Sequence, residues 1–208
     1  MPRSRFKLPL TLLAAATAAG LGSASFAEVI TDGSFEAQTL GDTEPGDNGF
    51  IGEFFVSADT TATVVDGTGV TDGSLALQVD RADGTAFGAV STFISSASIA
   101  AQGISTGDTL IFSGDLTYLS GTGQAQIRLF SNSTGSITAP LVSATTTSDS
   151  FSQTFTYGGD DLSFTLDTFG EVSAVVDNLS IVPEPGCLAL CGGGLFMLVS
   201  RRRRPARG

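Results

Sequence analysis

The carboxylate with the most unusual expected environment in this 208-residue sequence is that of Asp177. It shares parity with Val175, Leu179 and Ile181 in an alternating segment, which would turn it toward an apolar face. A carboxylate buried alone is very costly, so we expect it to be protonated, hydrogen-bonded or bound to a cation. The alternative is that Asp177 lies at a strand edge and accepts hydrogen bonds from backbone N–H groups.

Side chains that could catalyse a reaction are few. The sequence has no histidine, which removes histidine general bases and histidine-containing metal sites. Both cysteines lie near the C-terminus, so the preceding chain has neither a thiol nucleophile nor a disulfide. Paired carboxylates can hydrolyse glycosides, and Asp160-Asp161 or Asp80 with Asp83 are nominal candidates, but their turn-like contexts favour ordinary solvated acids. We predict no catalytic residue and no enzymatic activity.

Aromatic side chains that could stack on a sugar ring are also scarce. The sequence has no tryptophan and two tyrosines, Tyr118 and Tyr157. Both tyrosines follow the alternation of their apolar neighbours, so a core or half-buried position is favoured over glycan stacking. The fifteen phenylalanines are assigned mostly to the core.

These side chains must be positioned by β-structure. The sequence is rich in Gly, Ser, Thr, Val and Phe, and period-2 alternation recurs between turn signals such as Asp83-Gly84. In one such segment Ala125, Ile127 and Leu129 share a face while Arg128 points outward. Evenly spaced short strands predict an all-β fold, a single antiparallel β-sandwich or jelly roll over residues 28–182. The expected strands are 29–31, 35–37, 50–57, 61–65, 75–80, 86–94, 109–119, 124–131, 150–157, 162–167 and 172–182, with 42–49 as an exposed polar loop.

The two ends of this predicted sandwich carry a resemblance. The opening Ile-Thr-Asp-Gly-Ser-Phe-Glu (30–36) and the closing Val-Val-Asp-Asn-Leu-Ser-Ile (175–181) resemble the first and last strands of carbohydrate-binding-module and discoidin-like jelly rolls. The resemblance implies that both ends lie side by side and that Glu36 and Asp177 are side-chain ligands of a structural calcium ion. Calcium takes 6–8 oxygen ligands, often carboxylates and carbonyls, which an acid-rich chain can supply.

The N-terminal residues 1–27 have the pattern of a secretory signal peptide. Arg3, Arg5 and Lys7 precede an apolar, alanine-rich run over 8–22. Small residues before position 28 place cleavage by signal peptidase after Ala27. The protein is therefore expected to be exported.

The charge of the remaining body is strongly negative. Between Glu28 and Pro185, Arg81 and Arg128 stand against all 21 acidic residues, a formal net charge of −19 from two positive and 21 negative side chains. The negative electrostatic field of such a body argues against nucleic acid or anionic lipid as a partner and favours cations or basic surfaces. A solvated acidic surface that keeps a secreted protein soluble is the alternative.

The C-terminal segment 183–208 has three ordered features. Pro183-Glu184-Pro185 is predicted to be an extended, exposed hinge accessible to a protease. The uncharged run 186–200 would form an apolar helix of about 22 Å, short of the bilayer core of about 30 Å. A basic cluster follows, which the positive-inside tendency assigns to the cytoplasm and which consists of Arg201, Arg202, Arg203, Arg204 and Arg207.

These three features resemble a PEP-CTERM protein-sorting signal. The resemblance implies transient anchoring in an inner membrane, cleavage by an exosortase-type membrane protease, and release to the cell surface or extracellular matrix in an exopolysaccharide or biofilm setting. A plain C-terminal anchor that is never cut is the alternative. For the body we predict a non-enzymatic surface or matrix protein associated with exopolysaccharide. The second hypothesis is a carbohydrate-binding module that recognises a defined extracellular glycan.

Overall fold

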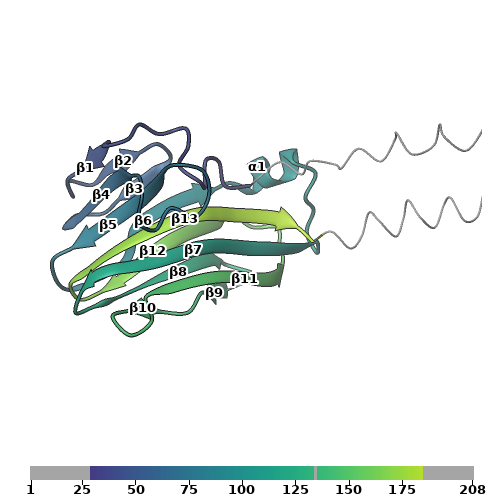
Figure 1. Cartoon of the computed structure of the whole chain (residues 1–208). Coiled ribbons are helices and arrows are strands. Elements are labelled where there is room, and N and C mark those ends of the chain that lie inside the picture. The colour runs from purple at the N-terminus through teal and green to yellow at the C-terminus, as the bar shows by residue number, and fades with distance from the viewer. Residues whose placement is uncertain (1–28, 134, 185–208) are drawn as a thin grey trace, which may run out of the picture.

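The structure, a computed structural model, describes residues 29–133 and 135–184. They form two facing sheets in which every strand pair is antiparallel, and a single short helix accompanies them within the described part (Figure 1). The predicted all-β antiparallel sandwich is thus confirmed. The expected signal peptide with Ala27, and the sorting segment from Pro185 through Arg201, Arg202, Arg203 and Arg204, lie outside the described residues. Within those residues, no helix has the length and apolar character needed to cross a membrane.

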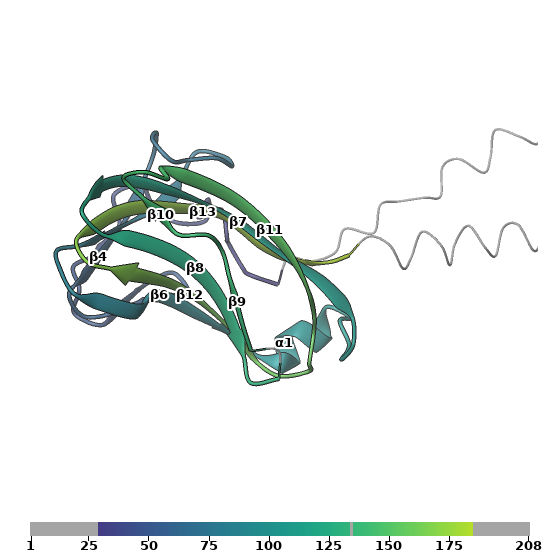
Figure 2. The same ribbon diagram turned by 90° about the horizontal axis from the view of Figure 1, so that it is seen from below.

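Sheet A contains six strands and sheet B seven. Sheet A has the order β1-β4-β5-β13-β7-β11, with bounds β1 Thr43–Glu44, β4 Thr60–Val65, β5 Ala76–Arg81, β13 Val172–Pro183, β7 Thr109–Gly121 and β11 Ser148–Thr156. Sheet B has the order β10-β8-β12-β6-β3-β2, with β9 beside β8, and bounds β10 Val142–Ser143, β8 Gln124–Ser131, β12 Leu162–Phe169, β6 Thr85–Ile94, β3 Phe54–Val56, β2 Gly49–Ile51 and β9 Gly135–Thr138. The long strands alternate between the layers, as in a jelly roll: β6, β8 and β12 lie in sheet B, and β7, β11 and β13 in sheet A (Figure 2).

The core fills the space between the two sheets. In β7 and β8 every second residue is buried, which is the alternation expected of strands with one face on a core. Phe54 packs against Phe35 at 4.9 Å and against Phe164 at 6.1 Å between ring centroids. All three rings are fully buried, and burying one such side chain contributes about 2–3 kcal/mol.

The start of the body is not strand, although strands were expected at 29–31 and 35–37. Asp32 and Phe35 adopt left-handed φ values of 54° and 60°, which interrupt regular strand geometry. The Asp32 carboxylate accepts a hydrogen bond from the Ala37 N–H at 2.9 Å and so fixes the turn. Val29, Ile30 and Phe35 are buried all the same, because the turn lies against β13.

Other differences occur where turns interrupt or extend the pattern. The expected strand 50–57 is broken at Gly52, whose φ of 57° separates β2 from β3. The polar stretch 42–49, expected to be a loop, contributes β1 and the first residue of β2. The strands β9 and β10 and the helix α1 (Ser96–Ala101), which Ser95 caps at its N-terminus, were not expected.

The two ends of the described chain lie side by side, as the resemblance implied. The Val29 N–H donates to the Ile181 carbonyl at 3.3 Å, and the Leu179 N–H donates to the Gly33 carbonyl at 2.9 Å. A Cβ at Gly33 would stand 1.9 Å from the Leu179 oxygen, so only glycine permits this approach.

The last strand continues further than expected. β13 was predicted to end at Val182, with an exposed hinge from there on. In the structure Pro183 still pairs with Leu110 of β7, and the Glu184 N–H donates to the Thr109 carbonyl at 2.9 Å. The first two residues of the predicted hinge are therefore held by the sheet.

Candidate functional site

Asp177 is fully buried, as its parity predicted, but it does not face the core. Val176 belongs to the core cluster, whereas Val175 is covered from the opposite side by Gly69, where a Cβ would stand 2.8 Å from the Val175 Cβ. The pairing of β13 with β7 shifts after Asp177, and Asn178 has a φ of 52°, so a bulge returns the following apolar residues to the core. The expected burial is confirmed, but the expected direction is wrong because of this bulge.

The carboxylate of Asp177 is held by a loop that connects β4 with β5, residues 66–75. Its Oδ2 accepts the N–H groups of Thr71 at 2.6 Å and Asp72 at 2.9 Å, and its Oδ1 accepts the Asn178 N–H at 2.7 Å. The Thr71 hydroxyl lies 3.2 Å from the same Oδ2. Backbone N–H groups thus solvate this buried carboxylate, as the alternative anticipated, although β13 lies between β5 and β7 and not at the edge of the sheet.

Glu36 holds the other end of the same loop. Its Oε1 accepts the backbone N–H groups of Ser74 at 2.5 Å and Leu75 at 2.7 Å. These two hydrogen bonds, that from Ser74 first, lower the pKa of the Glu36 carboxyl below its ordinary value. Glu36 and Asp177 thus each hold the 66–75 loop by accepting hydrogen bonds from its backbone N–H groups. We call these two sets of bonds the Glu36 clasp and the Asp177 clasp.

The residues around Asp177 fit a cation in one respect. The Thr71 hydroxyl lies 2.6 Å from Asp115 Oδ2 as well as near Asp177, yet it carries a single proton, so one of these carboxylates faces it without a hydrogen bond. A calcium ion between carboxylate oxygens would relieve that repulsion. In the described residues no three acidic, histidine or cysteine side chains form a ready-made metal cluster, so backbone carbonyls and water would complete the coordination.

The Glu36 clasp makes stability depend on pH. Because the pKa of the Glu36 carboxyl is lower in the folded protein than its ordinary value of 4.5, its stabilising effect is present above pH 4.5 and is lost as the pH falls through the folded pKa. Glu36→Gln should therefore be less stable than wild type at neutral pH, and the two should converge in acid. Urea midpoints measured across this range test it, with Asp66→Asn on the exposed part of the loop as control; a constant difference at every pH would contradict the clasp.

Neither tyrosine offers a ring to a ligand. The Tyr118 hydroxyl donates to the Gly121 carbonyl and the ring is 9% exposed, while Tyr157 is 3% exposed and its pKa is raised by burial. Both rings lie in the core, in agreement with the alternation of their neighbours. A glycan site must use other residues.

Four phenylalanines that composition assigned to the core are instead on the surface. Phe50, Phe87 and Phe93 are 66–72% exposed, and Phe130 is 39% exposed. The sequence carried a signal for two of them, since Phe130 has the parity of the outward-facing Arg128, and Phe93 has the opposite parity to the buried Val90. Of the twelve phenylalanines in the described residues, six are buried in the core: Phe35, Phe54, Phe112, Phe151, Phe155 and Phe164.

The register of sheet B gathers these rings on its outer face. Ser163 of β12 pairs with Phe130 on one side and Phe93 on the other, so the two rings stand two strand spacings apart, about 10 Å. Phe55 of β3 pairs with Phe50 of β2, and their ring centroids are 5.4 Å apart. We call Phe50, Phe55, Phe93 and Phe130 the phenylalanine face.

A groove of about 580 Å³ lies along this face. Phe50, Phe55 and Phe93 form its apolar wall, and the hydroxyls of Ser91 and Ser163 lie between the rings. Serine hydroxyls both donate and accept hydrogen bonds, so rings and hydroxyls alternate over one accessible surface.

An ion pair stabilises sheet B beside the phenylalanine face. Arg128 of β8 makes two hydrogen bonds to Asp167 of β12, at 2.7 Å from Nε and 3.1 Å from Nη2. The Gly88 N–H donates to the same carboxylate at 2.7 Å, and the Asp167 side chain is only 2% exposed. The hydrogen bond to Asp167 raises the pKa of Arg128, and the Phe87 ring covers the guanidinium at 5.9 Å.

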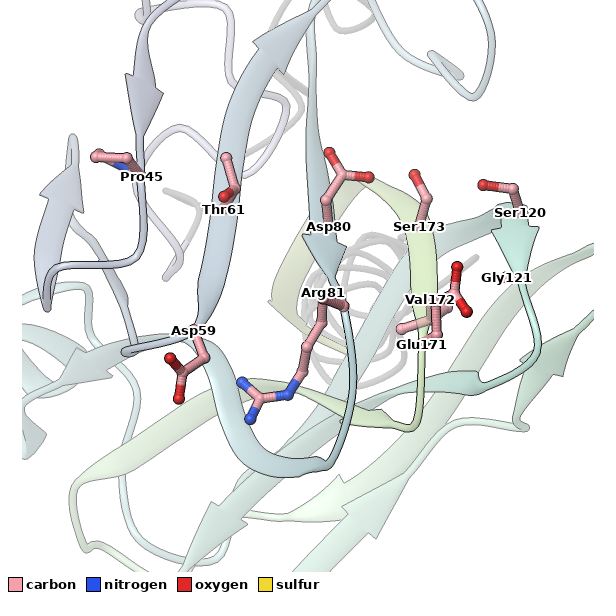
Figure 3. Close-up of a pocket in the computed structure, with 11 residues that line it drawn as sticks. Pro45, Asp59, Thr61, Asp80, Arg81, Ser120, Gly121, Glu171, Val172 and Ser173 are labelled. Atoms are coloured by element: carbon pink, nitrogen blue, oxygen red, sulfur yellow. The ribbon is translucent and has the colours of Figure 1, made fainter.

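A second, polar groove of about 410 Å³ lies on the outer face of sheet A (Figure 3). Four side chains from neighbouring strands form a row across it: Thr61, Asp80, Ser173 and Ser120. Arg81 turns away from the row and donates to the carbonyls of Asp83 and Ala58.

Two of the four nominal catalytic acids, Asp161 and Asp80, have structural partners. Asp161 Oδ1 accepts the Ser96 N–H at 2.7 Å at the start of α1, and this bond lowers the pKa of Asp161. Asp80 accepts two hydrogen bonds from the Gln78 amide. A carboxyl with a lowered pKa is a poor general acid at neutral pH, so Asp161 is not suited to that role.

Comparison with known proteins gives distant likenesses of the sandwich only. No protein-family model and no curated protein matches the chain. The structure of TmCBM61 in complex with β-1,4-galactotriose is similar at 9% identity and a TM-score of 0.49, over 76% of this chain and 99% of that one. The C-terminal family 22 carbohydrate-binding module of Clostridium thermocellum Xyn10B is similar at 13% identity and 0.48, over 74% and 99%. The enzymatically active domain of bacteriophage CBA120 tailspike protein 4 is similar at 10% and 0.48, over 76% of this chain and 21% of that one.

Proposed function

We propose that this protein is an exported, non-catalytic β-sandwich that binds a neutral extracellular glycan through the phenylalanine face. The observation that carries the proposal is the gathering of exposed rings and serine hydroxyls along one groove. Contiguous exposed apolar surface marks a binding site, and a sugar combines an apolar C–H face, which packs on an aromatic ring, with hydroxyls that need partners. A glycan chain laid obliquely across the strands would meet Phe130, Phe93 and then Phe55, which is level with Ser91.

The charges of the body support a neutral ligand. Its two arginines are already engaged, Arg128 by Asp167 and Arg81 by backbone carbonyls. The acidic side chains outnumber them 21 to two, so a uronate or a sulfated sugar would be repelled. Phenylalanine stacking requires no charge on the ligand.

Export and sorting complete the proposal. The signal-peptide pattern and the Pro-Glu-Pro, apolar and arginine features support an inner-membrane-anchored precursor that signal peptidase and an exosortase-type protease process to a cell-surface or matrix form. Because Glu184 is still hydrogen-bonded to Thr109, a protease acting on the folded domain would cut after Glu184. A purely structural matrix protein without a glycan ligand is the competing candidate, supported by the acidic surface.

A glycan array and one substitution test the glycan proposal. Phe93→Ala should weaken binding of the selected glycan by tenfold or more, about 1.4 kcal/mol, because a central aromatic anchor is removed. The array should span neutral oligosaccharides of different linkage, and Leu40→Ala, which removes another exposed apolar side chain, serves as control. If the wild type binds no neutral glycan, the structural matrix role replaces this proposal.

We also propose a structural calcium ion at Asp177, with Asp115 as a neighbouring carboxylate and with Glu36 hydrogen-bonded to the other end of the 66–75 loop. Calcium would supply positive charge where two carboxylates share one hydroxyl proton. With or without calcium, the Asp177 carboxylate would hold the 66–75 loop against β13 through its hydrogen bonds to Thr71 and Asp72.

A further inference from the structure

The polar groove on sheet A has no role in glycan binding by the phenylalanine face. We propose that this groove, which we call the Asp80 groove, is a second carbohydrate site that takes a neutral, hydroxyl-rich sugar. The inference goes beyond the proposed function, although a bridging role between two glycan chains rests on it. Three features of the groove carry the inference: its row of polar side chains, its restrained carboxylate and its excess of acidic over basic side chains.

The row follows the register of sheet A. Thr61 pairs with Asp80, Asp80 with Ser173, and Ser173 with Ser120, so the four side chains stand on adjacent strands at one level. Three strand spacings make this row about 14 Å long. Neighbouring side chains in the row are one strand spacing apart. Figure 3 shows the four side chains on the same side of the sheet.

The acceptor at the centre of the row is held in place. The Gln78 amide donates to both oxygens of Asp80, at 3.1 and 2.9 Å, and approaches the Ser173 hydroxyl at 3.4 Å. A carboxylate has about four acceptor positions, so Asp80 keeps positions for donors from a ligand. A restrained acceptor loses little entropy on binding.

The charges of the groove select the ligand class. Arg81 donates to Asp83, Ala58 and Thr60, so its guanidinium is engaged at the end of the groove. Asp59, Asp80 and Glu171 line the same space and would repel an anion. The groove therefore suits a ligand that donates hydroxyl protons to a carboxylate and exchanges hydrogen bonds with serine and threonine. A neutral sugar has this chemistry.

The Asp80 groove and the phenylalanine face lie on opposite surfaces of the sandwich. The Asp80 groove is on the outer face of sheet A, and the phenylalanine face is on the outer face of sheet B, with the core between them. One molecule can then hold two sugar chains on opposite surfaces. Without aromatic rings in the groove, its affinity should be lower than that of the phenylalanine face.

Backbone amide NMR of the full-length chain tests the second site directly. Glucose, galactose and xylose are added separately at millimolar concentrations, with glucuronate as the charged control. At least one neutral sugar should shift the amides of Asp80, Ser173 and Ser120, and glucuronate should not. Asp80→Ala should raise the dissociation constant at the groove about tenfold, because a charged acceptor is lost. Thr63→Ala, one row away on β4, should leave it unchanged.

The variant Phe93→Ala separates this proposal from the proposed function. Shifts in the Asp80 groove should persist in Phe93→Ala, while those at the phenylalanine face are lost. If none of the three neutral sugars moves the groove amides, or if Asp80→Ala binds as tightly as wild type, the second site is overturned. Shifts confined to the groove would support it and contradict the glycan role of the phenylalanine face instead.

Discussion

Replacing Asp177 by alanine should lower the free energy of unfolding by about 3 kcal/mol. The substitution removes the acceptor for the N–H groups of Thr71, Asp72 and Asn178 at once, and each buried donor left without a partner costs about 1–3 kcal/mol, reduced where water can enter. The 66–75 loop would lose one of its two clasps. Val175, which that loop covers, would be exposed to water.

Urea unfolding of the wild type and Asp177→Ala measures this loss and also tests calcium. If calcium binds at Asp177, a chelator lowers the wild-type midpoint and has no effect on the variant, since binding to the folded state alone stabilises it. Equal wild-type midpoints with calcium and with chelator would rule out the ion and leave hydrogen bonding as the role of Asp177. A variant as stable as Asp66→Asn, a control on the exposed part of the same loop, would contradict the clasp itself.

Replacing Arg128 by methionine should destabilise the protein by about 3 kcal/mol. The Asp167 carboxylate, 2% exposed, would keep the Gly88 N–H but lose its countercharge, and a buried charge without its partner costs about 3–5 kcal/mol. The partial exposure of Arg128 places the expected effect at the lower end of this range. Phe87 would also lose the guanidinium beneath its ring.

The double variant Arg128→Met/Asp167→Leu provides the matched comparison. Replacing both charges by apolar side chains removes the desolvation cost, so most of the lost stability should return. Thermal or urea unfolding of the wild type, Arg128→Met, Asp167→Leu and the double variant measures the coupling between the two residues. Additive losses in the double variant would show that Arg128 stabilises sheet B by packing alone.

The regular strands could be predicted because their alternation is strong. In β7 and β8 the buried residues recur at every second position, so sequence and structure agree closely there. The segment from Val29 to Ala37 was mistaken for two strands, because its apolar residues suggest burial while the left-handed φ values of Asp32 and Phe35 leave no mark in the alternation. The bulge at Asn178 also leaves no mark in the alternation, which is why the expected direction of Asp177 was wrong.

The candidate site was harder to predict because composition argued against it. Phenylalanine is most often a core residue, and a surface cluster of it becomes visible only when the strand order brings β8, β12, β6, β3 and β2 together. The outward parity of Phe93 and Phe130 was present in the sequence, but the pairing of both with Ser163 was not. The local alternation indicates on which face of a sheet a side chain lies, whereas the strand order determines which side chains lie next to it.

The crystal structure of the protein with the oligosaccharide that the glycan array selects tests glycan binding most directly. We expect sugar rings packed against Phe93 and Phe55, with hydroxyls bonded to Ser91 or Ser163 in the groove. Sugar bound elsewhere, with the rings of the phenylalanine face free of it, would contradict the account.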